Sequence, residues 1–251
     1  MHFSFGETAM IVLSAYYRGD VRPDDRKRFN SYLKNVHMPS VARWPGLRGL
    51  RLLTNDRQPY LEEAPRYYQA IELSFDSEKG LESSMASQER VETKELSQQD
   101  HAQFKDLFKG DILHTIYAVT EIPVVAPGEV NMLRCAYYMG DVSPDREAWM
   151  DTFSVTEHLP DVARWPRLTR LRHLKKTGSE FVGQAPEYYH VYELSFASQG
   201  DIDIAMASEE RKQTRKDMAE YRDPTTGRFF GFTGEVHHTN YTVEDFPVGI
   251  K

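Results

Sequence analysis

The sequence lacks the residues and patterns that define several classes of protein. Its 251 residues include a single cysteine, Cys135, so no internal disulfide can form, and a reducing cytoplasm is the expected location. No apolar run approaches the ~20 residues that a membrane helix needs, and the first residues lack the basic and apolar segments of a signal peptide. The net charge of −7 provides no basic surplus, which argues against nucleic-acid binding.

Patterns typical of metal and nucleotide sites are also missing. There is no His-x-x-x-His or Cys-x-x-Cys spacing and no glycine-rich phosphate loop. His237 and His238 are adjacent, so on a strand their rings point to opposite faces and do not form a chelating pair. We therefore expect neither a structural metal nor a bound cofactor.

The sequence does contain one long motif twice. The pattern H-x-P-x-V-A-R-W-P-x-L occupies residues 37–47 and recurs, 121 residues later, at 158–168. Toward the end of each half the offset rises to 124, which places three additional residues in a turn-rich segment around 223–227. We interpret the chain as a tandem duplication.

Each half has the pattern of a β-α-β-β-α-β unit, which predicts two ferredoxin-like domains, residues 1–120 and 130–251, joined by a linker at 121–129. Pro39 should end the first helix just after His37, and a second helical region should break near Ser87. The expected strands are rich in β-branched and aromatic residues: 9–18, 47–54, 67–75 and 112–119, then 130–138, 168–175, 188–196 and 236–243.

A four-stranded sheet with helices on one face leaves its other face uncovered. The linker is short and stiff, because it holds two prolines and a glycine, so the bare face of one half should meet that of the other. The predicted fold class is α+β, with the two repeats forming a dimeric α+β barrel within one chain. Since fusion covers both sheets, we expect a monomer or a weak homodimer.

The helix ending in His-x-Pro, followed by Trp-Pro-x-Leu and a strand, resembles the EthD family of the dimeric α+β barrel superfamily. The resemblance covers nearly the whole chain and implies a fused version of a domain that usually dimerises. The family is named after a gene cluster for degrading ether compounds. Related barrels include cofactor-free polyketide cyclases, a lactone isomerase, quinol-type monooxygenases and haem proteins, so the resemblance implies a fold more narrowly than a reaction.

His37 and His158 are the leading catalytic candidates. A histidine exchanges protons near neutral pH, and the negative end of a helix dipole favours the imidazolium. The alternative is a helix cap in which each ring bonds the last carbonyls. Both roles place the two histidines at the rim of a pocket beside the first helix.

Two arginine–tryptophan pairs, Arg43-Trp44 and Arg164-Trp165, come next as substrate-binding candidates. Arginine binds carboxylates or enolates, and an indole ring stacks on a flat substrate. The alternative, which we favour for the tryptophans, is a plug in the core with the arginine outside.

A further set of polar residues is expected in the space between the two sheets, where strand alternation directs them. Together they form either a proton relay or a hydrogen-bonded seam that fixes how the sheets pack, and the seam is the more common outcome. The set consists of Tyr68, Tyr189, Glu72, Glu193, His114 and His238.

These candidates suit a cofactor-independent lyase, isomerase or cyclase that acts on a small aromatic or polyketide-like compound by histidine-mediated proton transfer. The alternatives are a non-catalytic small-molecule-binding or accessory protein of a degradation pathway and, more remotely, a haem-binding barrel. The expected ligand is aromatic or anionic. Because Gly46 in one half is Arg167 in the other, and Ser40 is Asp161, we expect that one half could hold the single working site.

Overall fold

The computed structural model describes residues 10–104, 107–177 and 188–249. The first half contains four strands and two helical regions in the expected order. Its elements are β1 (Ile11–Val21), η1 (Pro23–Asp25), α1 (Arg26–Tyr32), η2 (Leu33–His37), α2 (Met38–Val41), β2 (Leu47–Thr54), β3 (Gln69–Phe75), α3 (Glu78–Met85), α4 (Gln88–Phe104) and β4 (Phe108–Ile122).

The second half repeats this order. Its elements are β5 (Met132–Val142), α5 (Glu147–Phe153), η3 (Ser154–His158), α6 (Leu159–Val162), β6 (Arg170–Lys176), β7 (Tyr188–Phe196), α7 (Gln199–Ala207), α8 (Glu209–Asp217), η4 (Met218–Tyr221) and β8 (Phe232–Phe246). Across the described ranges, no helix has both the length and the apolar character needed to span a membrane.

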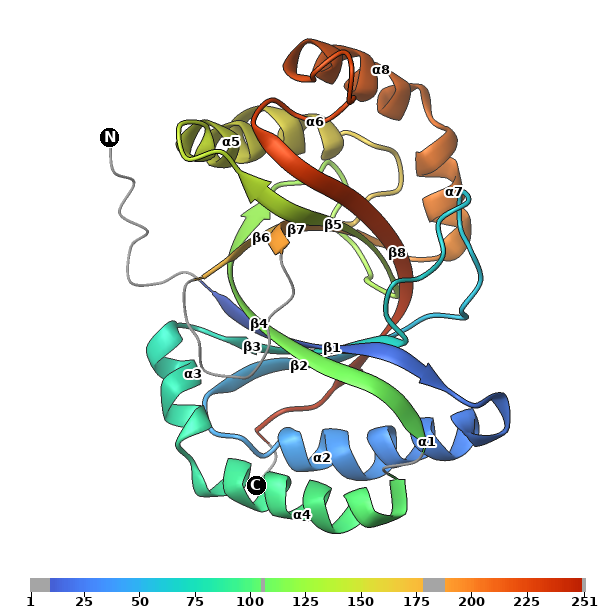
Figure 1. Ribbon diagram of the computed structural model, residues 1–251, viewed down its shortest axis with the longest axis vertical. Coiled ribbons are helices and arrows are strands. Elements are labelled where there is room, and N and C mark those ends of the chain that lie inside the picture. The colour runs from blue at the N-terminus through green and yellow to red at the C-terminus, as the bar shows by residue number, and fades with distance from the viewer. Residues whose placement is uncertain (1–9, 105–106, 178–187, 250–251) are drawn as a thin grey trace.

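The eight strands form one closed barrel with the order β1-β3-β2-β8-β5-β7-β6-β4 (Figure 1). Within each half the strands pair as in a ferredoxin-like sheet, and the halves join edge to edge through the antiparallel pairs β2–β8 and β4–β6. The helices of the two halves cover opposite outer sides of the barrel. The predicted fold class, a dimeric α+β barrel within one chain, is therefore confirmed.

Three buried clusters stabilise this arrangement. One lies between sheet and helices in each half, and the third fills the barrel interior. The interior cluster contains six tyrosines, three from each half, whose hydroxyls form the pairs Tyr16–Tyr117, Tyr67–Tyr188 and Tyr137–Tyr241. Paired hydroxyls allow these rings to be buried without orphaned polar groups.

Four charged side chains cross the barrel interior beside the tyrosines. Arg51 and Arg172 each bond the glutamate of their own half and reach the glutamate of the other half, with Arg172 Nη2 3.0 Å from Glu72 Oε2 and Arg51 Nη2 3.3 Å from Glu193 Oε2. Burial raises the pKa of both carboxyls and the arginines lower it, with the net result that the pKa of Glu72 falls to about 2. For Glu193, burial and the charge of Glu72 outweigh the arginines and raise the pKa to about 7.

The helix that contains His37 does not end there. The chain stays helical from α1 through α2, and the Met38 N–H bonds the carbonyl of Leu33, five residues back, in a π-turn. Pro39 then follows as the second residue of α2, and since proline has no N–H, the helix continues past it without a bond from that position. The same turn precedes Pro160, so the prediction that His37 and His158 lie at helix C-termini is wrong.

The predicted break near Ser87 is confirmed. Helix α3 ends at Met85 and α4 begins at Gln88, and the Ser87 hydroxyl accepts a hydrogen bond from the Arg90 N–H. A serine cap of this kind starts a new helix in a changed direction.

Strand alternation fails at the start of the third strand in each half. Tyr67 lies in the barrel interior and Tyr68 packs against the helix-side core, the reverse of the expected arrangement. In the second half the register shifts where Tyr138 and Met139 pair with β7, which leaves Tyr189 outside the barrel. A one-residue irregularity inverts the faces of the residues that precede it, whereas Glu72 and Glu193 keep the predicted inward direction.

Candidate functional site

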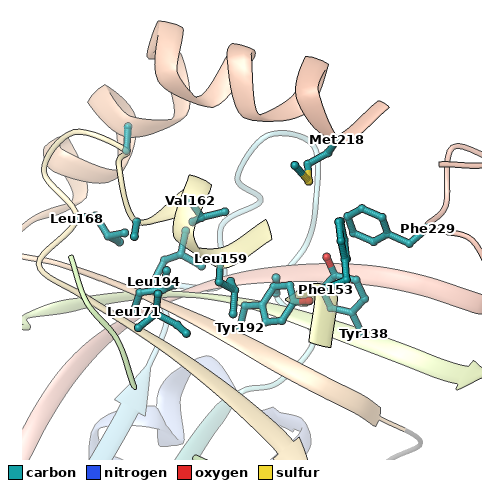
Figure 2. Packing of buried hydrophobic residues seen from close by; sticks show 14 of the residues in the cluster. Tyr138, Phe153, Leu159, Val162, Leu168, Leu171, Tyr192, Leu194, Met218 and Phe229 are labelled. Atoms are coloured by element: carbon teal, nitrogen blue, oxygen red, sulfur yellow. The ribbon is translucent and has the colours of Figure 1, made fainter. Parts of the chain in front are cut away.

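A pocket of about 560 Å³ lies in the second half, outside the barrel, between the sheet and the helices that cover it. Figure 2 shows Val162 and Met218 on the helical side, above Tyr138 and Tyr192 on the strands. The apolar part of the wall comes from β5, β7, β8, α6 and the loop that follows it, α7 and η4. Its residues are Ala136, Tyr138, Leu159, Val162, Trp165, Tyr192, Leu194, Met206, Met218 and Val236.

His158 lines this pocket from the π-turn of η3. The side chain is 9% exposed, and its Nδ1 is buried without a hydrogen-bond partner. The ring stacks on Phe153 and lies beside Tyr192 and Phe229. Burial, with a smaller contribution from the charge of Arg222, lowers the pKa of His158 to about 3, so the imidazole is neutral at pH 7.

Four guanidinium groups face the same pocket. They belong to Arg134 on β5, Arg211 and Arg215 on α8, and Arg222 after η4, and the carboxylate that lines the pocket with them is that of Glu63. Positive charge therefore exceeds negative charge around a mostly apolar wall. Such a site favours a flat molecule that carries an anionic group.

Glu63 reaches the pocket from the other half of the chain. The connection between β2 and β3 extends past the barrel to lie beside α7 and β8 (Figure 1), and Leu61 and Glu63 line the pocket there. The Glu63 carboxylate accepts hydrogen bonds from the His238 backbone N–H, at 2.7 Å, and contacts His238 Nδ1 at 2.9 Å. The site is thus built from both halves.

The backbone of this connection is strained at two adjacent positions. Leu61 and Glu62 have φ angles of 50° and 68°, in the left-handed region that residues with a Cβ rarely adopt. The loop is held by the Tyr60–Glu63 backbone pair and by a 2.8 Å hydrogen bond from the Tyr60 hydroxyl to Asp203 of α7. Strain that the surroundings maintain is typical of functional loops.

In each predicted arginine–tryptophan pair, the two side chains lie in different surroundings. Trp165 lines the pocket and donates from Nε1 to Thr214, at 3.1 Å, as Trp44 does to Thr93 at 3.0 Å. Both tryptophans thus join their loop to a covering helix. Arg164 instead bonds Asp161 with 62% of its side chain exposed, and Arg43 lies at the surface near Glu92.

Of the remaining candidates, only Glu72 and Glu193 lie between the sheets. His114 and His238 were expected there, but both belong to the outer face of their strands, and His238 lines the pocket. Tyr68 bonds Asn30 on the helix side. Tyr189 donates a 2.6 Å hydrogen bond to Asp151 and lies under the Lys175 ammonium, away from the pocket.

His37 occupies the position of His158 in the first half. It is half-buried, and burial lowers its pKa to about 4. Its Nδ1 lies 3.4 Å from the Ser97 hydroxyl, whereas His158 Nδ1 has no such partner. Ser97 corresponds to Met218 in the second half, so the two histidines have different surroundings.

The second half is also more polar beneath its helices. The first-half residues Leu13, Leu33, Leu52 and Ile71 correspond, at the offset of 121, to Arg134, Ser154, His173 and Tyr192. The Tyr192 hydroxyl bonds Ser154 Oγ at 2.8 Å, and His173 Nε2 lies 3.2 Å from His190 Nδ1. Sequence reasoning missed Arg134 and Tyr192, although comparing the halves position by position would have drawn attention to both.

A scan against protein-family models finds no match, and a search of curated proteins finds no relative. Among solved structures, an anthrone oxidase-like protein is similar, with 11% identity, a TM-score of 0.58, and coverage of 96% of this chain and 94% of that chain. A candidate monooxygenase from Fusobacterium nucleatum subsp. nucleatum ATCC 25586 has 8% identity, a TM-score of 0.57, and coverage of 96% and 93%. At these identities the similarity supports the shared fold and not an activity.

An EthD-family protein from Bacillus halodurans C-125 matches with 23% identity over 41% of this chain and 95% of its own, with a TM-score of 0.31. The chain has the fold of the dimeric α+β barrel superfamily with both copies fused.

Proposed function

We propose that the protein is an EthD-like, cofactor-independent enzyme that uses His158 to transfer a proton on a small aromatic or polyketide-like anion. One observation carries this proposal. The imidazole of His158, which is neutral at pH 7, lines a pocket that has aromatic walls and is surrounded by guanidinium groups. The reaction class is that of a lyase, isomerase or cyclase, in which a proton moves at a carbon next to a carbonyl.

The residues have distinct parts in this chemistry. The pKa of about 3 keeps the His158 ring unprotonated, and an anion formed beside it would raise that pKa, because opposite charge stabilises the imidazolium. The arginines stabilise an enolate once the proton has left the carbon. Tyr138 and Tyr192 provide the flat wall that orients the substrate ring.

Phenylpyruvate is a suitable probe, since it is aromatic, anionic and enolisable. We expect the protein to accelerate its keto–enol interconversion, followed by ultraviolet absorbance, and the exchange of its methylene protons in D₂O, followed by proton NMR. Replacement of His158 by Phe preserves the stacking on Phe153 and should reduce the catalysed rate by about 100-fold or more.

The matched control is His37→Phe, the same change at the equivalent position of the first half. It should leave the catalysed rate within about twofold of the wild type, because the first half has Leu13 and Ile71 at the positions of Arg134 and Tyr192. Full activity in His158→Phe would exclude the assigned role. Binding of the probe without any acceleration would favour the alternative, a non-catalytic binding or accessory protein.

Haem binding is the second candidate, and His158 is the observation that favours it. An imidazole that lines a roomy pocket could serve as an axial ligand, and the arginines could hold acidic side groups. A bound haem would supply redox chemistry at that site. Titration with haemin should produce a Soret band that His158→Phe abolishes if this candidate is correct, and free-haemin absorbance alone if it is not.

A further inference from the structure

Arg134 is the most buried of the four arginines around the pocket. It lies on the outer face of β5 with 5% of its surface exposed, and it pairs across the sheet with Asn240 of β8. The same two positions in the first half are Leu13 and Ile116, which also pair with each other. The half that holds the pocket thus has a cation and an amide where the other half has two aliphatic side chains.

The guanidinium of Arg134 is fixed in place by its neighbours. Its Nη1 donates to Asn240 Oδ1 at 2.8 Å, and its Cζ lies 5.1 Å from the centre of the Tyr60 ring. Gln199 holds the Asn240 amide at 3.3 Å, and Asp203 holds the Tyr60 hydroxyl. A charged group positioned by such a set of contacts is already organised for a ligand.

Arg134 has no ion pair among the described residues. Burial lowers the pKa of Arg134, and the nearby charge of Glu63 opposes that change only in part. A guanidinium has five N–H donors, and one of them is bonded to Asn240. The remaining donors belong to a side chain that lines the pocket, where a buried cation requires an opposite charge.

We propose that Arg134 is the receptor for a carboxylate, and that the substrate is an aromatic carboxylic acid whose ring lies against Tyr138 and Tyr192. This inference rests on the proposed function and specifies its substrate class. The planar fork of a guanidinium matches the two oxygens of a carboxylate. The apolar wall accommodates the ring that carries it, whereas a highly hydrated phosphate would gain little from that wall.

The test compares two ligands of the same shape, 1-naphthoate and the neutral 1-naphthamide, by isothermal titration calorimetry. The wild type should prefer the carboxylate by about tenfold to a hundredfold, the range expected for hydrogen bonds to a charged group. The variant Arg134→Leu with Asn240→Ile recreates the pair Leu13–Ile116 of the first half and leaves no orphaned amide. It should bind both ligands with equal affinity.

Two further variants complete the design. Arg164→Leu removes the arginine that bonds Asp161 at the surface and should keep the full preference for the carboxylate. Arg134→Lys keeps the charge without the planar fork and should show an intermediate preference for the carboxylate. This variant tests the assignment even if the double variant fails to fold. 1-Naphthyl phosphate and 1-naphthol distinguish a carboxylate site from a general anion or phenol site.

The outcomes separate the two proposals. If the double variant or Arg134→Lys keeps the full carboxylate preference of the wild type, or if the wild type prefers the phosphate, the assignment of Arg134 is overturned while the pocket remains a binding site. If the wild type binds 1-naphthoate and 1-naphthamide equally, the substrate class is wrong. If neither naphthalene binds, the proposed aromatic site itself fails, and the inference about Arg134 fails with it.

Discussion

Lowering the pH from 7 to 4.5 is expected to reduce the free energy of unfolding by about 3 to 6 kcal/mol, mainly through three buried histidines of the second half, with a contribution of the same sign from half-buried His37. Burial lowers the pKa of His158 to about 3 and that of His173 to about 4, and it lowers the pKa of His190 well below its usual value. All three rings are neutral and buried in the folded protein at neutral pH.

The direction of this effect follows from proton binding. Below pH 6.5 the unfolded chain protonates these histidines, while the folded chain keeps them neutral to a lower pH, about 3 for His158 and about 4 for His173, so acid favours the unfolded state. The contribution of these histidines to stability is complete above pH 6.5 and is lost as the pH falls. The pKa of Glu193 is raised to about 7, so this one group favours the folded state as the pH falls. Three histidines outweigh it.

Urea titrations at pH 7, 5.5 and 4.5 measure the effect. The variant His173→Leu with His190→Gln substitutes the residues found at the same positions of the first half, Leu52 and Gln69. Its stability should fall less between pH 7 and 4.5, by about 2 to 4 kcal/mol. If the free energy of unfolding falls as steeply with pH in this variant as in the wild type, groups other than His173 and His190 cause the acid sensitivity.

Arg172→Met should destabilise the protein by about 3 to 5 kcal/mol, the largest loss expected from a single substitution. The side chain is 2% exposed and bonds both Glu72 and Glu193 inside the barrel. Without it, two buried carboxyls share the single guanidinium of Arg51, and their repulsion is no longer balanced. Thermal and urea unfolding report the change directly.

The control for this prediction is a pair of the same type at the surface. Arg48 and Asp76 lie within bonding distance with most of both side chains exposed, so Arg48→Met should change stability by less than about 1 kcal/mol. A second comparison replaces the four charged residues inside the barrel with apolar residues of similar size. These residues are Arg51, Glu72, Arg172 and Glu193. If that variant is as stable as the wild type, the cluster fixes how the halves join and contributes little net free energy.

The sequence was sufficient to predict the barrel, because the repeat, the strand patterns and the short linker all imply two sheets packed face to face. It was also sufficient to select His158, Trp165 and His238, which line the pocket. It could not predict that His158 lies in a π-turn, since proline after a histidine usually indicates the end of a helix. The π-turn depends on tertiary packing and has no clear local signal.

The location of the site was the main error of sequence reasoning. Polar residues on strands were assigned to the space between the sheets, but one-residue irregularities before Gln69 and at Tyr189 changed which side chains enter it. Glu63 and Arg134 were not singled out, because a loop glutamate and a strand arginine have no motif around them. Their importance depends on contacts between segments far apart in the chain, such as Glu63 with His238.

The loop that carries Glu63 from one half to the pocket of the other has an evolutionary consequence. In a symmetric homodimer, any substitution in such a loop alters both copies of the site at once. In the fused chain, the loop and the pocket belong to different copies of the repeat, so each can diverge for its own task. Because the pocket includes a loop from the neighbouring repeat, deleting either repeat would dismantle it.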